Sequence, residues 1–285
     1  MSSATTTPSV ERARTIDAHG EVSNRLPRNA WLVDALVIAG RNLKDLRRTP
    51  QLIVFSVVQT VMFLLLFRYV FGGSIEIPGL SYVNFIVCGF MAQIAIFDGF
   101  GVAIAMAEDS KSGLIDRFRA LPMARSAVVG GRAAADLLRQ AGLVLIVIGV
   151  GFLIGFTVEG SVLGVIAAVG LCVVWGFAMF WVFAAVGLFV RDSETAQAAT
   201  TPFFILVFVS SSVILVDTLP GWLQPFARNQ PLTQVCNAVR GLVEGDAGAA
   251  LSPGTTGHYV IISLIWCAGI TAVFAPIAIY AYRRP

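Results

Sequence analysis

Six apolar stretches, each long enough to cross a bilayer, dominate this chain of 285 residues. They cover 52–71, 82–106, 140–157, 162–190, 197–216 and 259–281. A helix needs about 20 apolar residues to cross a hydrocarbon core of roughly 30 Å, and backbone in lipid must satisfy its own hydrogen bonds. The pattern therefore predicts an all-α integral membrane protein with six transmembrane helices. The fifth stretch is the weakest, because a helix over its strongly apolar part, about fifteen residues, rises only about 22 Å.

Basic residues are distributed unevenly between the segments that connect these stretches. If the N-terminus is cytoplasmic, all of the 20 basic residues except Arg68, Arg228 and Arg240 fall on the cytoplasmic side. The positive-inside rule then predicts that both termini and 107–139 are cytoplasmic, and that 72–81 and 217–258 are extracytoplasmic. Arg greatly outnumbers Lys, and Ala, Gly and Val are abundant. This composition indicates a bacterial source, so we expect a multi-pass protein of a bacterial plasma membrane.

Outside the spans there is little room for a second domain. Residues 1–30 are rich in Ser, Thr and Arg and contain no apolar run, which predicts a disordered cytoplasmic tail and no cleavable signal peptide. Residues 31–284 are expected to form one transmembrane domain. The formal net charge of +3 comes from the inner arginines, and attraction to anionic lipid explains it better than a nucleic-acid partner, which we do not expect.

Residues 31–49 have the spacing of an amphipathic helix that precedes the first span. Apolar residues recur at steps of three and four. Its polar face carries Arg41, Lys44, Asp45 and Arg48. Such a helix lies in the inner headgroup layer with its basic face toward water and phosphate. The alternative is an ordinary juxtamembrane helix that has no partner.

The loop between the second and third spans combines an apolar stripe with charged flanks and ends at a proline. Its candidate contact residues are Glu108, Asp109, Gly113, Leu114, Asp116, Arg117, Phe118, Arg119, Leu121 and Pro122. Because this segment hangs from two membrane helices, a soluble partner that held it could move both helices together. The alternative is a solvated loop that only satisfies the positive-inside rule.

Three further local patterns concern helix packing. From about Ser126 the chain is expected to enter a long third helix, along which Arg132, Asp136 and Arg139 form a ladder of opposite charges. Four glycines in the fourth stretch predict tilt or close helix packing; they are Gly164, Gly170, Gly176 and Gly187. Residues 217–258 mix apolar and polar groups between prolines, which predicts short interfacial helices outside the membrane.

Signatures of an independent enzyme are missing from the sequence. It contains no Gly-Lys pair, and hence no GxxxxGK[ST] phosphate loop. The two histidines, His19 and His258, lie in the tail and outside the membrane, and the four cysteines are scattered. Neither a catalytic triad nor a metal site is predicted. An enzyme that works alone is therefore not expected, and neither are catalytic residues or a bound cofactor.

Two separate motifs resemble one family. The run 108–125, continued by Gly131–Arg139, and the run 210–234 are similar to permease subunits of ABC type-2 exporters, best of all to the daunorubicin-resistance family of drug and lipid exporters in actinobacteria. The resemblance covers about 31–284. It implies an entrance helix over 31–49 and a coupling helix over Asp109–Leu121. It also implies that two permeases pair, as a homodimer or a heterodimer, and that each docks a separate subunit that binds ATP and Mg²⁺.

The same resemblance implies a substrate path lined by the first, second and fifth spans. The candidate residues are Gln59, Gln93, Asp98, Ser210, Ser211 and Ser212. Asp98 stands out, because a carboxylate inside a span costs about 2.5–3.5 kcal/mol on insertion scales unless it finds a partner or water. It either attracts a cation in the path, makes a helix–helix hydrogen bond, or lies at headgroup depth. The serines are otherwise expected to make hydrogen bonds between helices.

The leading hypothesis is the permease subunit of an ATP-driven exporter that moves amphipathic drugs or lipids out of the cell. The same architecture with a polysaccharide or glycolipid as cargo is a second reading. A third, of a different class, is a proton-coupled secondary transporter that uses Asp98. No inverted repeat and no paired intramembrane charges are expected, which argues against it. A structural or regulatory subunit is disfavoured, because it should lack polar residues inside its spans.

Overall fold

The structure is a computed structural model that describes residues 50–72, 77–112, 125–190, 192–251 and 253–283. Every regular element among these residues is a helix, as predicted. The elements are α2 (Pro50–Leu66), the π-helix η1 (Phe67–Phe71), α3 (Tyr82–Lys111), α5 (Arg125–Leu153), α6 (Val162–Phe189), α7 (Ser193–Phe208), the 3₁₀ turn η2 (Val216–Thr218), α8 (Gln224–Asn229), α9 (Pro231–Glu244), α10 (Asp246–Ala250) and α11 (Thr256–Arg283).

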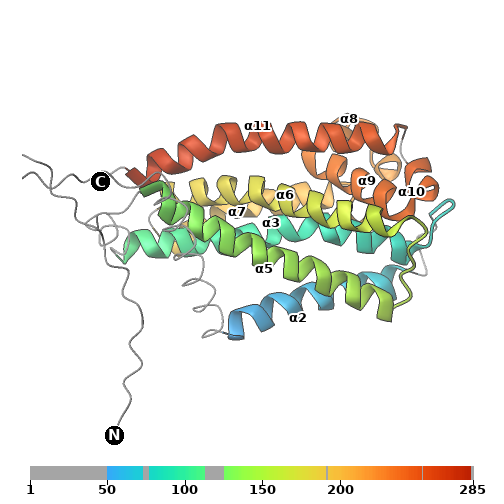
Figure 1. The fold of residues 1–285 in the computed structure, drawn as a ribbon, viewed down its shortest axis with the longest axis horizontal. Coiled ribbons are helices and arrows are strands. Elements are labelled where there is room, and N and C mark those ends of the chain that lie inside the picture. Colours follow the sequence, from blue (N-terminus) through green and yellow to red (C-terminus); the bar gives the residue numbers. More distant parts are fainter. Residues whose placement is uncertain (1–49, 73–76, 113–124, 191, 252, 284–285) are drawn as a thin grey trace, which may run out of the picture.

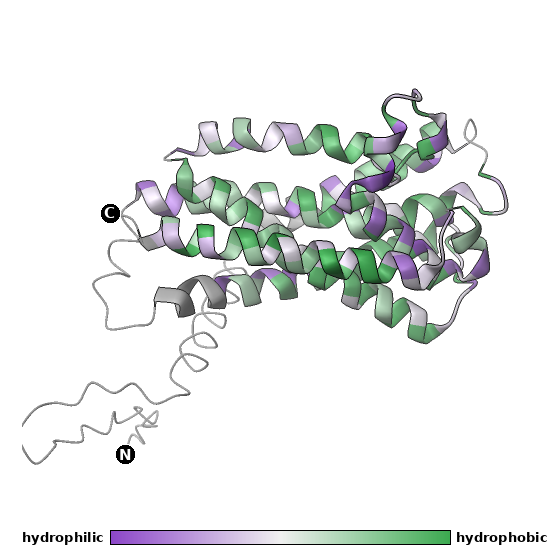
Figure 2. Cartoon of the chain, turned by 90° about the horizontal axis from the view of Figure 1, so that it is seen from above, coloured by the Kyte–Doolittle hydropathy of each residue, from purple (hydrophilic) through white to green (hydrophobic). Residues whose placement is uncertain are grey.

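Four of these helices are long and apolar enough to cross a membrane. They cover Tyr82–Lys111, Arg132–Leu153, Val162–Phe189 and Thr256–Tyr282, and they confirm the second, third, fourth and sixth predicted stretches. Figure 2 shows apolar residues along the middle of the long helices and hydrophilic ones mainly toward their ends. The prediction that the third stretch continues to residue 157 is wrong, because α5 ends at Leu153 and Gly155 then turns the chain with a φ of 98°.

The first and fifth predicted spans are shorter helices. In the first, α2 continues directly into η1, so that the chain is helical from 50 to 71. In the fifth, α7 has 16 residues and rises about 24 Å, less than the roughly 30 Å of a hydrocarbon core. It ends at Phe208 rather than at the predicted 216. The expected shortness of the fifth helix is thus found.

Helix α3 is the centre of the bundle. It packs against α5, α6, α7 and α9, and most of its residues are buried. Figure 1 shows α11 along one side of the bundle and α2 along the opposite side. The central position of α3 agrees with its apolar composition, because a helix that is apolar on all faces is stable only when other apolar surface or lipid surrounds it.

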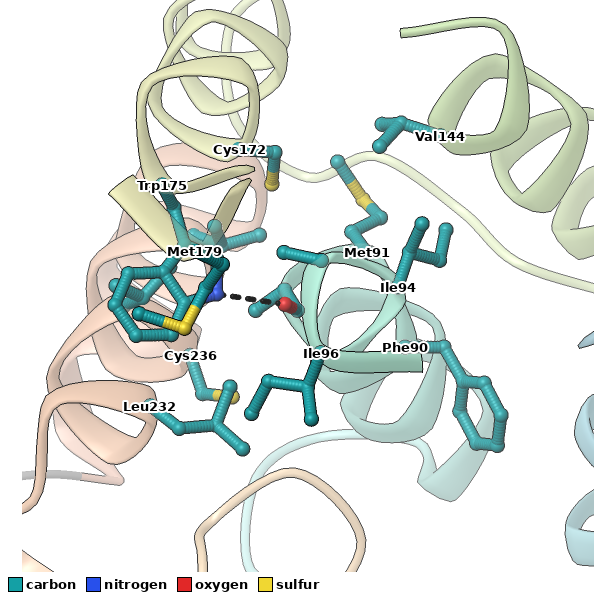
Figure 3. Packing of buried hydrophobic residues seen from close by; sticks show 14 of the residues in the cluster. Phe90, Met91, Ile94, Ile96, Val144, Cys172, Trp175, Met179, Leu232 and Cys236 are labelled. Atoms are coloured by element: carbon teal, nitrogen blue, oxygen red, sulfur yellow. Dashed lines mark hydrogen bonds between the residues drawn. The ribbon is translucent and has the colours of Figure 1, made fainter. Parts of the chain in front are cut away.

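The α3–α6 contact forms the core. The indole nitrogen of the buried Trp175 on α6 donates a hydrogen bond of 3.0 Å to the carbonyl oxygen of Ala92 on α3 (Figure 3). Three of the four predicted α6 glycines, Gly164, Gly176 and Gly187, allow close approach of a neighbouring helix. A Cβ on Gly187 would lie 2.2 Å from the carbonyl oxygen of Ala103 on α3, and one on Gly176 would clash with the Gln140 side chain of α5.

The helices alternate in direction, so that their ends form two layers. One layer, the Lys111 end, contains the ends of α3, α6 and α11 and the starts of α5 and α7 (Figure 1). The other layer, the Tyr82 end, contains the start of α3, the turn at 154–161 and the short helices η2, α8 and α10. A short turn precedes α6, and Ser161 caps this helix by accepting a hydrogen bond of 3.0 Å from the backbone N–H of Gly164.

The short helices after α7 differ from the prediction in one respect. As predicted, α8 and α9 begin beside prolines, Pro225 and Pro231. Trp222 and Phe226 are exposed, as an interfacial position requires. Helix α9, however, is not interfacial: nearly all of its residues are buried against α3, α6 and α11. Its apolar face and its polar face both find partners inside the bundle.

Candidate functional site

Most of the predicted coupling residues lie outside the described residues. Glu108 and Asp109 are in the last turn of α3. The structure does not describe Gly113, Leu114, Asp116, Arg117, Phe118, Arg119, Leu121 and Pro122, nor the interface-helix residues Arg41, Lys44, Asp45 and Arg48. The predicted long third helix is present, since α5 begins at Arg125.

An ion pair joins the two helices that flank the predicted coupling segment. The guanidinium of Arg132 on α5 donates to the carboxylate of Asp109 on α3. The predicted charge ladder along α5 is therefore only half right. Arg139 and Asp136 pair within α5 at 2.6 Å, but Arg132 pairs across to α3 instead. Since both partners are partly exposed, solvent weakens this pair, and it fixes geometry more than it adds stability.

A second ion pair lies deeper between the same two helices. The Nη2 atom of Arg139 is 2.8 Å from the Oδ1 atom of Asp98, and the Asp98 side chain is almost fully buried. Asp98 is about 20 Å along α3 from either end of that helix. The pair with Arg139 makes Asp98 part of a contact between two helices, one of the expected alternatives. The expectation of no paired intramembrane charges is wrong for the candidate spans, because Arg139 lies within the apolar helix Arg132–Leu153 and not in a cytoplasmic extension of it.

A cavity of about 40 Å³ opens beside Asp98, between α2, α3 and α5. Its wall is mostly aromatic and apolar, with a few polar groups. The lining residues are Gln59, Thr60, Phe63, Phe90, Ile94, Phe97, Asp98 and Leu143. Two of the predicted path residues, Gln59 and Asp98, are therefore brought together by the fold. An apolar pocket with a few convergent polar groups is the usual form of a small-molecule site.

The other predicted path residues do not line this cavity. Gln93 is buried, and its Oε1 atom has no hydrogen-bond partner among the described residues. Ser210, Ser211 and Ser212 are buried just beyond the end of α7. Ser211 makes the predicted bond to another helix, since its backbone N–H donates to Thr233 Oγ1 on α9 at 3.1 Å. The hydroxyls of Ser210 and Ser212 instead donate locally, to the carbonyl oxygen of Val207 at the end of α7.

Sequence reasoning did not identify a buried arginine that binds the segment following α7. Arg240 of α9 is 1% exposed, and its guanidinium donates to the carbonyl oxygens of Phe85, Ser211 and Ser212. Its carbon Cζ is 3.6 Å from the centre of the Phe85 ring. No described carboxylate forms an ion pair with it. The guanidinium thus satisfies buried carbonyl groups of α3 and of the segment after α7, whereas the carbonyl oxygen of Val207 in the last turn of α7 accepts from the hydroxyls of Ser210 and Ser212.

Glu244, one turn later on α9, was also missed. It is 1% exposed, and its Oε2 atom accepts a hydrogen bond of 2.8 Å from the side-chain amide of Asn84 on α3. Burial raises the pKa of the Glu244 carboxyl to about 7; the hydrogen bond from Asn84 lowers it and the nearby Glu159 raises it. The spacing of Arg240 and Glu244 by four residues put both on one face of α9, and this was the available signal.

Comparison with known proteins identifies the family of transporters that this chain resembles. The family model described as ABC-2 type transporter matches residues 34–243. A daunorubicin resistance ABC transporter permease protein of Streptomyces coeruleorubidus is 30% identical over 283 residues, which are 98% of this chain and 95% of that protein. A probable doxorubicin resistance ABC transporter permease protein of Mycobacterium tuberculosis is 27% identical over 260 residues, 89% of this chain and 90% of that protein.

Proposed function

The chain belongs to the ABC-2 type transporter family as a non-catalytic membrane component, and we propose that it exports amphipathic drugs or lipids, driven by a separate ATP-binding subunit. The observation that carries the proposal is similarity over nearly the whole chain to a permease named for daunorubicin resistance. A local match could reflect helix composition alone, whereas one across 98% of the chain includes the loops and the short helices.

In this proposal, the ATP-binding subunit acts on the permease through residues 109–121. The segment begins at the end of α3 and returns to the start of α5, so that a partner subunit that moves it moves both helices. The Asp109–Arg132 ion pair ties the two helices together at this point. The Asp98–Arg139 pair ties them again beside the cavity. Because two ion pairs join α3 and α5, we expect these helices to move as a unit. They would then transmit motion from the partner subunit to the substrate path.

The path itself is proposed to form where two permeases meet. Helices α2 and α7 have apolar side chains that no described residue covers, including Val58, Met62 and Ile205. Such faces are satisfied by lipid or by a second membrane subunit. We propose that α2, α3 and α7 of two permeases enclose the path, that both termini are cytoplasmic, and that the Tyr82 end is extracytoplasmic. Six spans complete this arrangement.

Uptake into inside-out vesicles tests the proposal. The vesicles contain the chain co-expressed with the ATP-binding subunit of its own host, and daunorubicin, which is fluorescent, serves as the probe. We expect uptake that requires ATP, survives a protonophore, and is lost when the ATP-binding subunit is omitted. Uptake that a proton gradient drives without ATP would contradict the proposal.

That contrary result would support the second candidate, a proton-coupled secondary transporter. One specific observation favours this candidate: the described part of the chain holds Asp98, Arg139 and Asp136 as an intramembrane charge cluster. Clusters of ionisable groups inside spans are common in proton relays. The family membership favours the ATP-driven reading, and the vesicle experiment separates the two by their energy source.

A further inference from the structure

The bend that follows α7 is buried in the bundle. Helix α7 ends at Phe208, and the next serines, Ser210, Ser211 and Ser212, are at most 5% exposed. Because 16 helical residues rise only about 24 Å, the bend lies short of the far edge of a hydrocarbon core of roughly 30 Å. Its backbone groups must find their hydrogen-bond partners inside the protein, since lipid offers none.

One face of α9 supplies these partners. The guanidinium of Arg240 donates to the carbonyl oxygens of Ser211 and Ser212 and to the hydroxyl of Ser211. The backbone N–H of Ser211 donates to Thr233 Oγ1, and its hydroxyl donates to Asn237 Oδ1, both at 3.1 Å. The three α9 residues follow one another at steps of four and three, so they share one side of the helix. Helix α9 thus binds both the N–H and the carbonyl groups of the bend.

The same guanidinium also binds the start of α3. Its Nη2 atom donates to the carbonyl oxygen of Phe85 at 3.3 Å, and its Cζ atom lies 3.6 Å from the centre of the Phe85 ring. Helix α3 touches the bend directly as well, because Gly89 has no room for a Cβ where the carbonyl group of Ser212 lies. One side chain, that of Arg240, therefore joins α3 to the end of α7.

The shape of the guanidinium matters more here than its charge. No carboxylate among the described residues forms an ion pair with Arg240. Glu244, one turn later on α9, accepts from Asn84 instead. A guanidinium presents five N–H donors in a rigid planar fork and stacks on an aromatic ring, whereas the ammonium group of a lysine is a point charge on a flexible stem. Only the fork can hold carbonyl groups of two segments at fixed positions.

We propose that Arg240 is a positioning residue for transport: it fixes the end of α7 on the start of α3, so that these two helices move together at the Tyr82 end when the ATP-binding subunit acts at the Lys111 end. The inference rests on the proposed export function, in which α3 and α7 line the path. Without this contact, ATP hydrolysis should continue, because 109–121 is unchanged, whereas less substrate should move for each ATP hydrolysed.

Hydrogen exchange of the purified permease in lipid nanodiscs tests the contact without any cargo. Arg240→Lys keeps the charge but lacks the fork, and Thr233→Val removes the acceptor of the Ser211 N–H by a smaller change. In each variant we expect the amides of 209–213 to exchange about tenfold faster, which corresponds to about 1.4 kcal/mol, while those of α6 keep their rates. Arg228→Lys is the matched control, because Arg228 is exposed and pairs only with groups at the surface.

Transport per ATP tests the consequence. Daunorubicin uptake and ATP hydrolysis are measured in the same inside-out vesicles, which contain the permease and its ATP-binding subunit. For Arg240→Lys and Thr233→Val we expect hydrolysis near the wild-type rate and uptake per ATP several-fold lower, while Arg228→Lys changes neither. A residue that only stabilises the fold would lower both activities in proportion to the amount of folded protein and leave their ratio unchanged.

The outcomes separate this inference from the export function. Unchanged exchange at 209–213 in both variants would overturn the inference, and so would an unchanged ratio of uptake to hydrolysis in variants whose bend exchanges faster. Either result, together with ATP-driven uptake by the wild type, would leave the export function standing. A wild type that takes up no daunorubicin would refute the export function instead, and the exchange rates would still decide whether Arg240 holds α7 on α3.

Discussion

At the scale of single residues, several buried polar groups of this bundle pair across helices that are far apart in the chain. Arg240 on α9 binds backbone carbonyls beside α3 and after α7, and Glu244 binds Asn84. None of these partners is visible in the sequence, because a helical pattern predicts neighbours three and four residues away and not contacts between distant helices. For this reason Arg139 was expected in the cytoplasmic part of the third helix: its charge ended the predicted span, and its partner Asp98 belongs to another helix.

Glu244 yields a prediction for the pH dependence of stability. Its pKa is about 7 in the folded protein, against an ordinary value of 4.5. Between these values the folded state binds a proton that the unfolded state has released, so the free energy of unfolding falls as pH rises through this window. Glu244→Gln, which stays neutral, should flatten this dependence and raise the melting temperature by a few degrees at pH 8, where the wild type carries a buried charge.

The melting temperature of the detergent-solubilised protein, measured from pH 5 to pH 8, checks this prediction. Glu194→Gln is the matched control, because Glu194 is exposed on α7 and its loss should leave the pH profile unchanged. A profile for Glu244→Gln that falls as steeply with pH as that of the wild type would show that another group titrates in this window.

At the scale of elements, the sequence predicted the long helices well and the short ones poorly. Helices α3, α6 and α11 contain the apolar runs that composition predicted, although α3 continues to Lys111 and α11 covers Thr256–Arg283. Helix α9 was expected at the interface because residues 217–258 mix apolar and polar groups between prolines. Its Arg240 and Glu244 are buried and hydrogen-bonded instead. Sequence periodicity shows that a helix has two faces, but it does not show whether the polar face meets water or other polar groups.

The glycines of α6 provide a prediction at this scale. Gly187→Ala should destabilise the protein by about 1–3 kcal/mol, the usual cost of overpacking, because its Cβ would meet the Ala103 carbonyl of α3 at 2.2 Å and backbone must move. Gly170→Ala is the control on the same helix. Nothing lies within 4 Å of its Cβ, and alanine favours the helix by up to about 1 kcal/mol.

Thermal melting of the two variants in the same detergent checks the comparison. We expect Gly187→Ala to melt below the wild type and Gly170→Ala to melt at or above it. Equal melting temperatures for both variants would mean that α3 and α6 are not in close contact at this position.

At the scale of the whole molecule, the orientation in the membrane can be tested with single cysteines. The four native cysteines are buried, so labelling by an impermeant maleimide should have a low background. Ser112→Cys, at the Lys111 end, should be labelled only after the cells are opened. Trp222→Cys, whose position is 80% exposed at the Tyr82 end, should be labelled in intact cells. Labelling of Ser112→Cys from outside would reverse the proposed topology.

The central claim is that this chain transports only when a separate ATP-binding subunit acts on residues 109–121. The most direct measurement is ATP hydrolysis by the chain alone, by the chain co-purified with the co-expressed ATP-binding subunit of its host, and by the same preparation of a Phe118→Ala, Arg117→Glu double variant. We predict no hydrolysis by the chain alone, hydrolysis by the complex, and a correctly inserted double variant that fails to retain the subunit, since loss of an aromatic anchor at an interface costs about 2 kcal/mol or more. Hydrolysis by the chain alone, or a double variant that retains the subunit and transports normally, would contradict the account.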